Sequence, residues 1–257
     1  MNIAICCPSY KRPRVETLDI YPHTRVYIAE NEYESYVEAN PGGSDIVTMP
    51  DEVQGNISRV RNYILDAEFE QGADGVLLID DDMKGIYRFD PVEAERGVFG
   101  YQKNLLSEEH LIEFVNEAFE LCAEWGYKFW GVNCLTDSMA YRHYSPFSTT
   151  AFIGAPFHAH LRNPIRYDER LPLEEDYDIT LQHMNVYRGA LRFNAYNYDC
   201  KQSKQTGGCA NYRNIAREKE QFELLQKKWG SRIVKQDNAS IKNFDYNPII
   251  HIPIKGI

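Results

Sequence analysis

Short runs of apolar residues, each followed by a polar turn, recur along the first third of the chain. Three of them, at 2–7, 25–29 and 46–49, have the length and apolar content of strands. A fourth run, at 75–79, has four apolar residues after a glycine, which is typical of a strand buried in a parallel sheet. Between the last two runs, the stretch 55–69 places its apolar residues at the period of a helix. This order of strands and helix predicts the opening half of a nucleotide-binding α/β sheet.

The rest of the chain continues the alternation after an irregular interval. The stretch 85–102 is rich in turn residues and has no clear period, which predicts a flap without regular structure. An amphipathic helix then begins at its N-cap, Ser107, and a strand at 128–133 follows it. Further on, an acidic cluster opens a helix that Gly189 closes, and a strand at 191–198 returns to the sheet. Together these elements predict a Rossmann-type α/β fold, a mostly parallel central sheet flanked by helices.

Composition narrows the class of protein. The chain of 257 residues has a net charge of -10, which argues against a uniformly basic nucleic-acid coat protein but leaves room for a local basic groove. We find no apolar run of the length that spans a membrane, and we expect no membrane association. The six cysteines form no CxxC pair, so we expect reduced, buried thiols and a cytoplasmic location.

The strand at 75–79 ends in three consecutive carboxylates, Asp80, Asp81 and Asp82. They must surface at the carboxyl end of the sheet, where open α/β folds bind their ligands. With a period of two, Asp80 and Asp82 point to the same side, about 6 to 7 Å apart, and can reach one cation. Asp81 then faces sugar or backbone donors. Hard oxygen ligands suit Mg²⁺ or Mn²⁺ and hence a diphosphate; the alternative is an ordinary acidic turn on an acidic protein.

Other strand ends supply candidate nucleotide contacts. The first strand is followed by a Pro-bounded loop in which Tyr10 can stack on a base and Arg12 can reach a phosphate or ribose, although the loop can equally be a plain turn. The second strand ends in Glu30, which can accept from a ribose hydroxyl or a base imino group. The start of the helix at 55–69 leaves amides for an anion. Candidate nucleotide contacts in the loop and the helix are Pro8, Ser9, Ser58 and Arg61.

A second acidic cluster, Glu174, Glu175 and Asp176, lies at the start of the helix that Gly189 closes. One of these carboxylates can project into the site as a general base that deprotonates an acceptor hydroxyl. The alternative is that they only complement the positive end of the helix, since acidic residues are favoured in a first turn. His158 and His160 share a strand face, but we expect a structural role for them and no metal.

The ordered set of these motifs resembles the GT-A class of nucleotide-sugar-dependent glycosyltransferases over about residues 2 to 200. It comprises the Pro8-Ser9-Tyr10 loop, Glu30, Arg61-Asn62, the DxD motif Asp80-Asp81-Asp82 and the segment from Tyr167 to Asp176. The resemblance implies that Asp80 and Asp82 bind Mn²⁺ or Mg²⁺, and that Asp176 or Glu175 is the base of an inverting enzyme. It also implies one glycosyltransferase domain, with a donor-binding half at about 1–105, an acceptor-binding half at 106–200 and a basic C-terminal segment at 201–257.

A narrower resemblance is to the small glycosyltransferases of bacterial viruses that modify DNA bases, including TET-associated glycosyltransferases and hydroxymethylcytosine arabinosyltransferases. It implies transfer of a sugar from a UDP-sugar to the hydroxymethyl group of 5-hydroxymethylcytosine in double-stranded phage DNA, in the cytoplasm of the infected cell. The compact length, the Pro-Ser-Tyr-Lys-Arg-Pro opening and the Gly-Gly pair near residue 207 carry this resemblance.

The last quarter of the chain supplies the remaining candidates. Lys204, Gly207 and Gly208 can close over the diphosphate, with Lys201 or Lys204 countering the charge of the leaving nucleotide. Basic residues here can track DNA phosphates, although such runs are commonly a solvated helix face. The resemblance adds His251 as a third metal ligand. The candidate DNA contacts are Lys201, Arg213 and Arg217.

Two other activities and one binding role fit the same residues. A glycosyltransferase directed at a carbohydrate or cell-surface glycan would use the aromatic segment 141–157 as a platform for its acceptor. A nucleotidyltransferase or a metal-dependent phosphohydrolase would use the Asp triplet to transfer phosphate. The third alternative is a nucleic-acid binding module without catalysis, for which a net charge of -10 is unfavourable.

Overall fold

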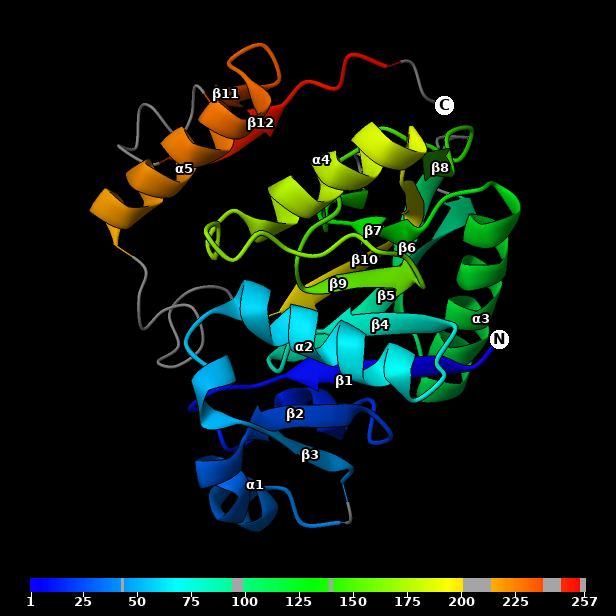
Figure 1. Ribbon diagram of the computed structural model, residues 1–257. Coiled ribbons are helices and arrows are strands. Elements are labelled where there is room, and N and C mark those ends of the chain that lie inside the picture. Colours follow the sequence, from blue (N-terminus) through cyan, green and yellow to red (C-terminus); the bar gives the residue numbers. More distant parts are fainter. Residues whose placement is uncertain (43, 94–98, 139–140, 201–213, 238–245, 255–257) are drawn as a thin grey trace.

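The computed structural model describes residues 1–42, 44–93, 99–138, 141–200, 214–237 and 246–254. One ten-stranded sheet organises the chain, and a two-stranded sheet lies near its C-terminus (Figure 1). The strands are β1 (Ile3–Pro8), β2 (Arg25–Ala29), β3 (Ile46–Met49), β4 (Gly75–Ile79), β5 (Met83–Glu93), β6 (Phe99–Leu105), β7 (Phe129–Asn133), β8 (Phe147–Ser148), β9 (Phe157–Leu161), β10 (Leu191–Cys200), β11 (Val234–Gln236) and β12 (Pro248–Ile250). The α-helices are α1 (Tyr33–Ala39), α2 (Ile57–Glu70), α3 (Glu108–Glu124), α4 (Glu175–Tyr187) and α5 (Ile215–Trp229).

The large sheet has the strand order β3-β2-β1-β4-β9-β7-β10-β5-β6, and β8 pairs with β10. The four strands at the β3 edge pair in parallel, β10 pairs in parallel with β7, and β9 runs antiparallel between β4 and β7. Strands β1, β2, β3, β4, β7 and β10 therefore run in one direction, and their carboxyl ends meet at one edge. The predicted fold class is confirmed.

Helices cover both faces of the sheet, so β4 is buried on both sides. Val76 and Leu78 pack in one core with side chains of α2 and α4, whereas Leu77 and Ile79 pack in another core with side chains of α3. Figure 1 shows α2 and α4 on one face and α3 on the other. The period of two in β4 divides these cores, and each helix turns its apolar stripe to the sheet. Asn56 caps α2 by accepting from Ser58 N at 3.0 Å.

The stretch 85–102 corrects the sequence prediction of an irregular flap. Its described residues, 85–93 and 99–102, lie within β5 and β6, which pair antiparallel from Tyr87 opposite Leu105 onward. β5 also pairs antiparallel with β10, so the hairpin extends the large sheet. Its sequence hides the strands, because Pro91, a residue that disfavours a strand, lies inside β5, and because the buried residues Ile86 and Phe89 do not alternate. Pairing with a strand that lies far along the sequence supplies the order that the local pattern lacks.

The C-terminal elements pack on the outer side of α4. Leu225 of α5 and Val234 of β11 share an apolar cluster with Leu181 of α4. Beside this cluster, Trp229 Nε1 donates to the fully buried Asp178 at 2.7 Å. Figure 1 shows α5, β11 and β12 as a group next to α4. In the described part of the chain, none of the helices combines the length and apolarity needed to span a bilayer.

Candidate functional site

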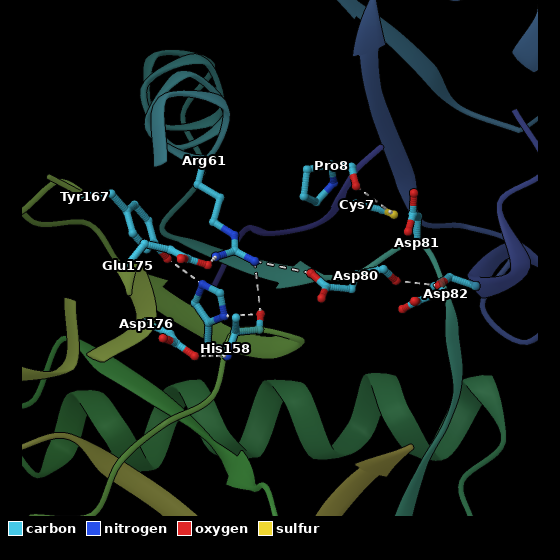
Figure 2. Close-up of polar contacts among 12 residues, drawn as sticks. Cys7, Pro8, Arg61, Asp80, Asp81, Asp82, His158, Tyr167, Glu175 and Asp176 are labelled. Atoms are coloured by element: carbon cyan, nitrogen blue, oxygen red, sulfur yellow. Dashed lines mark hydrogen bonds and ion pairs between the residues drawn. The ribbon is translucent and has the colours of Figure 1, made fainter. Parts of the chain in front are cut away.

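The carboxyl edge of the sheet gathers two acidic segments that lie far apart in the sequence (Figure 2). β4 ends at Ile79, and the turn that follows carries Asp80, Asp81 and Asp82. The Asp80 backbone N–H donates to the carbonyl of Pro156 at 3.1 Å, in the segment that leads into β9. This bond connects the acidic turn to the segment beside the start of α4, where the second acidic cluster lies.

Asp81 is turned into the protein, where two protein donors bind it. Ser9 Oγ donates to it at 2.5 Å and Arg12 Nη1 at 2.8 Å, and its carboxylate is buried. Ser9 Oγ also lies 2.8 Å from the hydroxyl of Tyr36 on α1. Asp81 therefore holds the loop after β1 against the end of β4, and its oxygens contact side-chain donors of the protein, where sugar or backbone donors were expected.

Asp82 and Asp80 differ in their surroundings. Asp82 is 8% exposed and has Arg12 Nη1 at 3.5 Å. Its burial, together with the neighbouring charges of Asp80 and Asp81, raises its pKa to about 7. The Asp80 side chain is 30% exposed and lies 3.3 Å from Arg61 Nη2. A cation would relieve the repulsion between these carboxylates.

Arg61 connects the two acidic segments. Its side chain is 2% exposed, and Nη1 donates to Glu175 at 2.8 Å while Nη2 donates to Asp80 at 3.3 Å. Nη2 also lies 3.4 Å from the carbonyl of Ala155. Figure 2 shows the guanidinium between Glu175 and Asp80. By contrast, Arg59, which lies two residues before Arg61 on α2, donates to the backbone carbonyls of Val53 and Gln54, which precede the helix.

Asp176 lies in the first turn of α4 beside this ion pair. One oxygen accepts from the Ala155 N–H at 3.3 Å, and the other accepts from the Tyr177 N–H at 2.8 Å. Burial and the charge of Glu175 raise the pKa of Asp176 to about 7, against the opposing effect of Arg61. Burial also raises the pKa of Glu175. A carboxyl with a pKa near neutrality is suited to accept a proton from a substrate hydroxyl.

The donors of this edge fit a divalent cation only in part. Asp80 and Asp82 supply hard oxygens on one turn, which suits Mg²⁺ or Mn²⁺. Among the described residues, however, no three His, Cys, Asp or Glu side chains are gathered in a way that could hold a metal. His251 is exposed and follows β12, where its backbone N–H donates to Ile233. Two carboxylates are the usual protein contribution for Mg²⁺, because waters and phosphates complete its shell.

The predicted nucleotide contacts near β1 and β2 line the same edge. Pro8 ends β1, and the ring of Tyr10 lies 4.9 Å from the ammonium of Lys11. Glu30, exposed, directly follows β2. Ser58 is fully buried, and within the described part of the chain its hydroxyl has no hydrogen-bond partner. Ser58 is therefore packed inside the protein and does not line the edge.

The predicted basic contacts fall mostly on residues that the structure does not describe. Arg217 lies exposed in the first turn of α5. Further along this helix, the ammonium of Lys228 bonds the carboxylates of Asp168 and Asp178 at 2.9 Å each, so this cation stabilises the docking of α5. The predicted residues outside the described ranges are Lys201, Lys204, Gly207, Gly208 and Arg213.

Sequence reasoning missed a buried network under the site. Tyr167 places its hydroxyl 2.5 Å from His158 Nε2 and 2.9 Å from His160 Nε2. His158 Nδ1 lies 2.8 Å from the carbonyl of Ala155, the residue that contacts Asp176 and Arg61. The structural role expected for the two histidines agrees with this placement. Their spacing on one strand face was the visible signal, whereas nothing local pointed to Tyr167 as their partner.

Comparison with known proteins gives a likeness in structure alone. The chain matches no family model and no curated protein. It is similar to glucosyl-3-phosphoglycerate synthase from Mycobacterium tuberculosis in complex with Mn²⁺, uridine diphosphate and glucosyl-3-phosphoglycerate, with a TM-score of 0.50, 10% identity, and coverage of 97% of this chain and 87% of that chain.

Two further likenesses are weaker. Another complex of that synthase, with Mn²⁺, UDP-glucose and phosphoglyceric acid, has a TM-score of 0.49, 9% identity, and coverage of 99% of this chain and 88% of that chain. CMP:2-keto-3-deoxy-manno-octonic acid synthetase complexed with CTP has a TM-score of 0.43, 10% identity, and coverage of 88% of this chain and 100% of that chain. The likeness at a TM-score of 0.50 concerns the fold alone, and it shows that this chain has a GT-A-like α/β fold.

Proposed function

We propose that this protein is a metal-dependent glycosyltransferase that uses a UDP-sugar as donor. The observation that carries the proposal is the group of five carboxylates, Asp80 to Asp82, Glu175 and Asp176, at the carboxyl edge of a GT-A-like sheet. Within this group, two guanidinium groups, Arg12 and Arg61, make the ion pairs, so negative charge is in excess. Such an excess favours a divalent cation together with a bound diphosphate.

Asp80 and Asp82 would hold Mn²⁺ or Mg²⁺, as the metal that this fold class uses. The bound ion would supply charge stabilisation for the departing nucleoside diphosphate. The neighbour of known activity was crystallised with Mn²⁺ and uridine diphosphate, which supports this choice of ligands. Protein contacts to the nucleotide would come from the loop at Pro8 to Tyr10, from Arg12 and from Glu30, and the predicted contacts of Lys204, Gly207 and Gly208 remain part of the proposal.

Asp176 is the base that the geometry favours over Glu175. Glu175 forms an ion pair with Arg61 at 2.8 Å. This ion pair stabilises the charged form of Glu175 and occupies its carboxylate, so Glu175 is not available to a substrate hydroxyl. Asp176 is held by two backbone N–H groups, and its pKa of about 7 allows it to take a proton near neutral pH. A base in this position, opposite the donor, would give inversion at the sugar carbon.

The acceptor we propose is the hydroxymethyl group of 5-hydroxymethylcytosine in double-stranded DNA. The resemblance of the sequence to phage DNA-base glycosyltransferases supports it, as does the fact that a 5-substituent of a pyrimidine is reachable from the major groove. Flipping the base out would enclose the reaction further. The basic residues Lys201, Arg213 and Arg217 would then contact phosphates.

A carbohydrate acceptor is the second candidate, and one observation favours it. The rings of Phe152 and Tyr177 stack at 4.2 Å, and Tyr177 directly follows the proposed base Asp176. A pair of stacked rings beside a base is a suitable platform for the apolar face of a sugar. The engagement of Lys228 by two carboxylates also removes one cation from any DNA surface.

One assay separates these possibilities. The protein is incubated with Mn²⁺, a panel of UDP-sugars, and either duplex DNA with 5-hydroxymethylcytosine, plain duplex DNA or oligosaccharides, and the release of UDP and the mass of the acceptor are measured. We expect release that depends on the hydroxymethylated duplex and gains the mass of one sugar. Release with oligosaccharides alone would assign the carbohydrate acceptor, and a nucleotide or phosphate added to the acceptor would overturn the glycosyltransferase. Asp82→Asn serves as the inactive control.

A further inference from the structure

We propose that Tyr167 is a positioning residue, which acts through His158 to fix the segment 154–156 between the proposed base and the metal-binding turn. This inference rests on the proposed function. Tyr167 itself is 3% exposed and lies beneath the site, so it would not touch a substrate. Its effect on turnover would come entirely from the backbone that it holds in place.

The segment 154–156 is bonded to both acidic clusters. Ala155 N–H donates to Asp176 at 3.3 Å, its carbonyl lies 3.4 Å from Arg61 Nη2, and the carbonyl of Pro156 accepts from the Asp80 N–H at 3.1 Å. A displacement of this segment would therefore change the orientation of the base, the arginine and the acidic turn together. Figure 2 shows Asp176 and Arg61 on either side of His158.

The segment is also closely packed. A Cβ added to Gly154 would lie 2.5 Å from the hydroxyl of Tyr198 and 2.7 Å from Cys134 Sγ, so only glycine fits there. On its other side, His158 Nδ1 lies 2.8 Å from the Ala155 carbonyl. The bond from His158 thus holds a segment that has little room to settle elsewhere.

One arrangement of protons satisfies the network. Because a carbonyl can only accept, His158 Nδ1 must carry a proton and donate to Ala155. Burial lowers the pKa of His158 and keeps the ring neutral, so Nε2 has a lone pair and accepts from the Tyr167 hydroxyl at 2.5 Å. The oxygen of Tyr167 in turn accepts from His160 Nε2 at 2.9 Å. Tyr167 therefore fixes both the tautomer and the ring orientation of His158.

Burial makes this dependence strong. His158 is 1% exposed and His160 is 0% exposed, and the ring of Phe129 lies 4.8 Å from that of His160. Water cannot replace the hydroxyl of Tyr167 in such surroundings without a cavity of its own. Removing that hydroxyl would leave His158 Nε2 without a donor and would free the ring to turn away from Ala155.

Tyr167→Phe tests the inference, with Tyr187→Phe as the matched control. Tyr187 is half-buried and stacks on the ring of His183 at 5.6 Å, and in the described part of the chain it makes no hydrogen bond to segment 154–156. We expect Tyr167→Phe to lower kcat by about 10- to 100-fold, because a small displacement of catalytic groups has effects of that size. The Kd of UDP with Mn²⁺ should change by less than about twofold, and Tyr187→Phe should leave both values unchanged.

A second pair of variants tests the bond to Ala155. Asn at position 158 can still donate an amide N–H to the carbonyl, whereas Ala cannot, so kcat of His158→Asn should exceed that of His158→Ala by about tenfold. Hydrogen–deuterium exchange of the peptide that contains Ala155 gives a readout without activity. Exchange of this peptide should be faster in Tyr167→Phe and His158→Ala than in wild type, while exchange of the peptides of α3 should not change.

The outcomes keep this inference separate from the proposed function. If exchange at Ala155 rises while the wild-type protein transfers no sugar, the positioning is supported and the glycosyltransferase fails. If transfer is observed but Tyr167→Phe keeps its kcat, or loses it only in proportion to a general loss of folding, the positioning role is overturned. Equal kcat values for His158→Asn and His158→Ala would overturn it as well.

Discussion

Two clusters of charged side chains, at opposite ends of the parallel strands, differ in their charge balance. At the amino-terminal side, Glu68 of α2 accepts from Arg25 Nη1 at 2.7 and 2.9 Å, from the hydroxyl of Tyr27 at 2.6 Å and from Cys6 Sγ at 3.4 Å. At the carboxyl edge, four carboxylates pair with two arginines, and a fifth, that of Asp176, accepts only from backbone N–H groups. The first cluster matches each acceptor with a donor, whereas the second has more negative charge than the protein neutralises.

The comparison teaches that charge imbalance, and not concavity, marks the candidate site. A cavity of about 620 Å³ opens at the amino-terminal side, and its lining includes Asn2, Arg25 and Glu68. Its central charged groups already satisfy one another, and the ion pairs raise the pKa of Arg25. At the other edge, burial and mutual repulsion raise the pKa of Asp82 and of Asp176 to about 7 each, which is typical of groups that serve a ligand or a reaction.

The largest expected effect is at Asp82 in the unbalanced cluster. Asp82→Asn removes one of the two proposed metal ligands, and we expect the rate of transfer to fall by about 10,000-fold, or about 5 kcal/mol, because charge stabilisation of the leaving diphosphate is lost. Binding of UDP should lose its dependence on Mn²⁺ in calorimetric titration. Asp19→Asn, which removes an exposed carboxylate paired with Arg14, is the control and should be active. Normal Mn²⁺-dependent binding by Asp82→Asn would exclude it as a ligand.

A somewhat smaller effect is expected at the base. Asp176→Asn should lower kcat by about 1,000-fold, since a positioned general base contributes on that order, while the Kd for UDP with Mn²⁺ is unchanged. Single-turnover kinetics with saturating donor measure the step directly. If Glu175→Gln lowers kcat to the same degree with unaltered stability and Asp176→Asn does not, the base is Glu175.

The sequence revealed the unbalanced cluster but not its internal contacts. The Asp triplet and the acidic helix start were visible because each is a local pattern at the end of a regular element. The bond of Arg61 to Glu175 joins residues 114 positions apart, and no local pattern encodes it. The same holds for Tyr167 under His158, because the backbone of Tyr167 is held in place by the side chain of Asn62, 105 positions away on α2.

The strands of the fold also divide into those that the local sequence pattern predicts and those that it does not. Strands β1 to β4 were predicted because each is a short, mainly apolar run followed by a polar turn, and β4 is buried on both faces. Strands β5 and β6 were missed, because β5 carries Pro91 and because their order comes from pairing: β5 pairs with β10, and β6 pairs with β5. Local pattern therefore predicts strands that are short, mainly apolar runs, including the edge strand β3, but not strands whose order comes from distant partners.

We expect substitutions in the balanced cluster to lower the free energy of unfolding and to leave the transfer activity unchanged. Glu68→Gln leaves Arg25 with one exposed partner and removes a buried charge that accepts four bonds, so we expect a loss of about 3 kcal/mol in the free energy of unfolding. Asp45→Asn is the matched control, because Asp45 bonds the same arginine with a side chain that is 55% exposed, and should cost less than about 1 kcal/mol. Denaturant titration measures both. Loss of transfer activity in folded Glu68→Gln would contradict the structural role of this cluster.

The smallest expected effect is a gain in stability, and it distinguishes the two clusters most directly. The folded protein raises the pKa of Asp82 from 3.8 to about 7, so between these values the folded state holds a proton that the unfolded state has lost. The contribution of Asp82 to the stability of the metal-free protein therefore falls as the pH rises from about 4 to 7, and above pH 7 this loss is complete. Asn cannot ionise, so metal-free Asp82→Asn should be more stable than wild type by about 1 to 2 kcal/mol at pH 8. The advantage should vanish at pH 4, and Mn²⁺ with UDP should stabilise only the wild type. Thermal unfolding at the two pH values measures it, and a variant less stable than wild type at pH 8 without metal would show that Asp82 is as well compensated as Glu68.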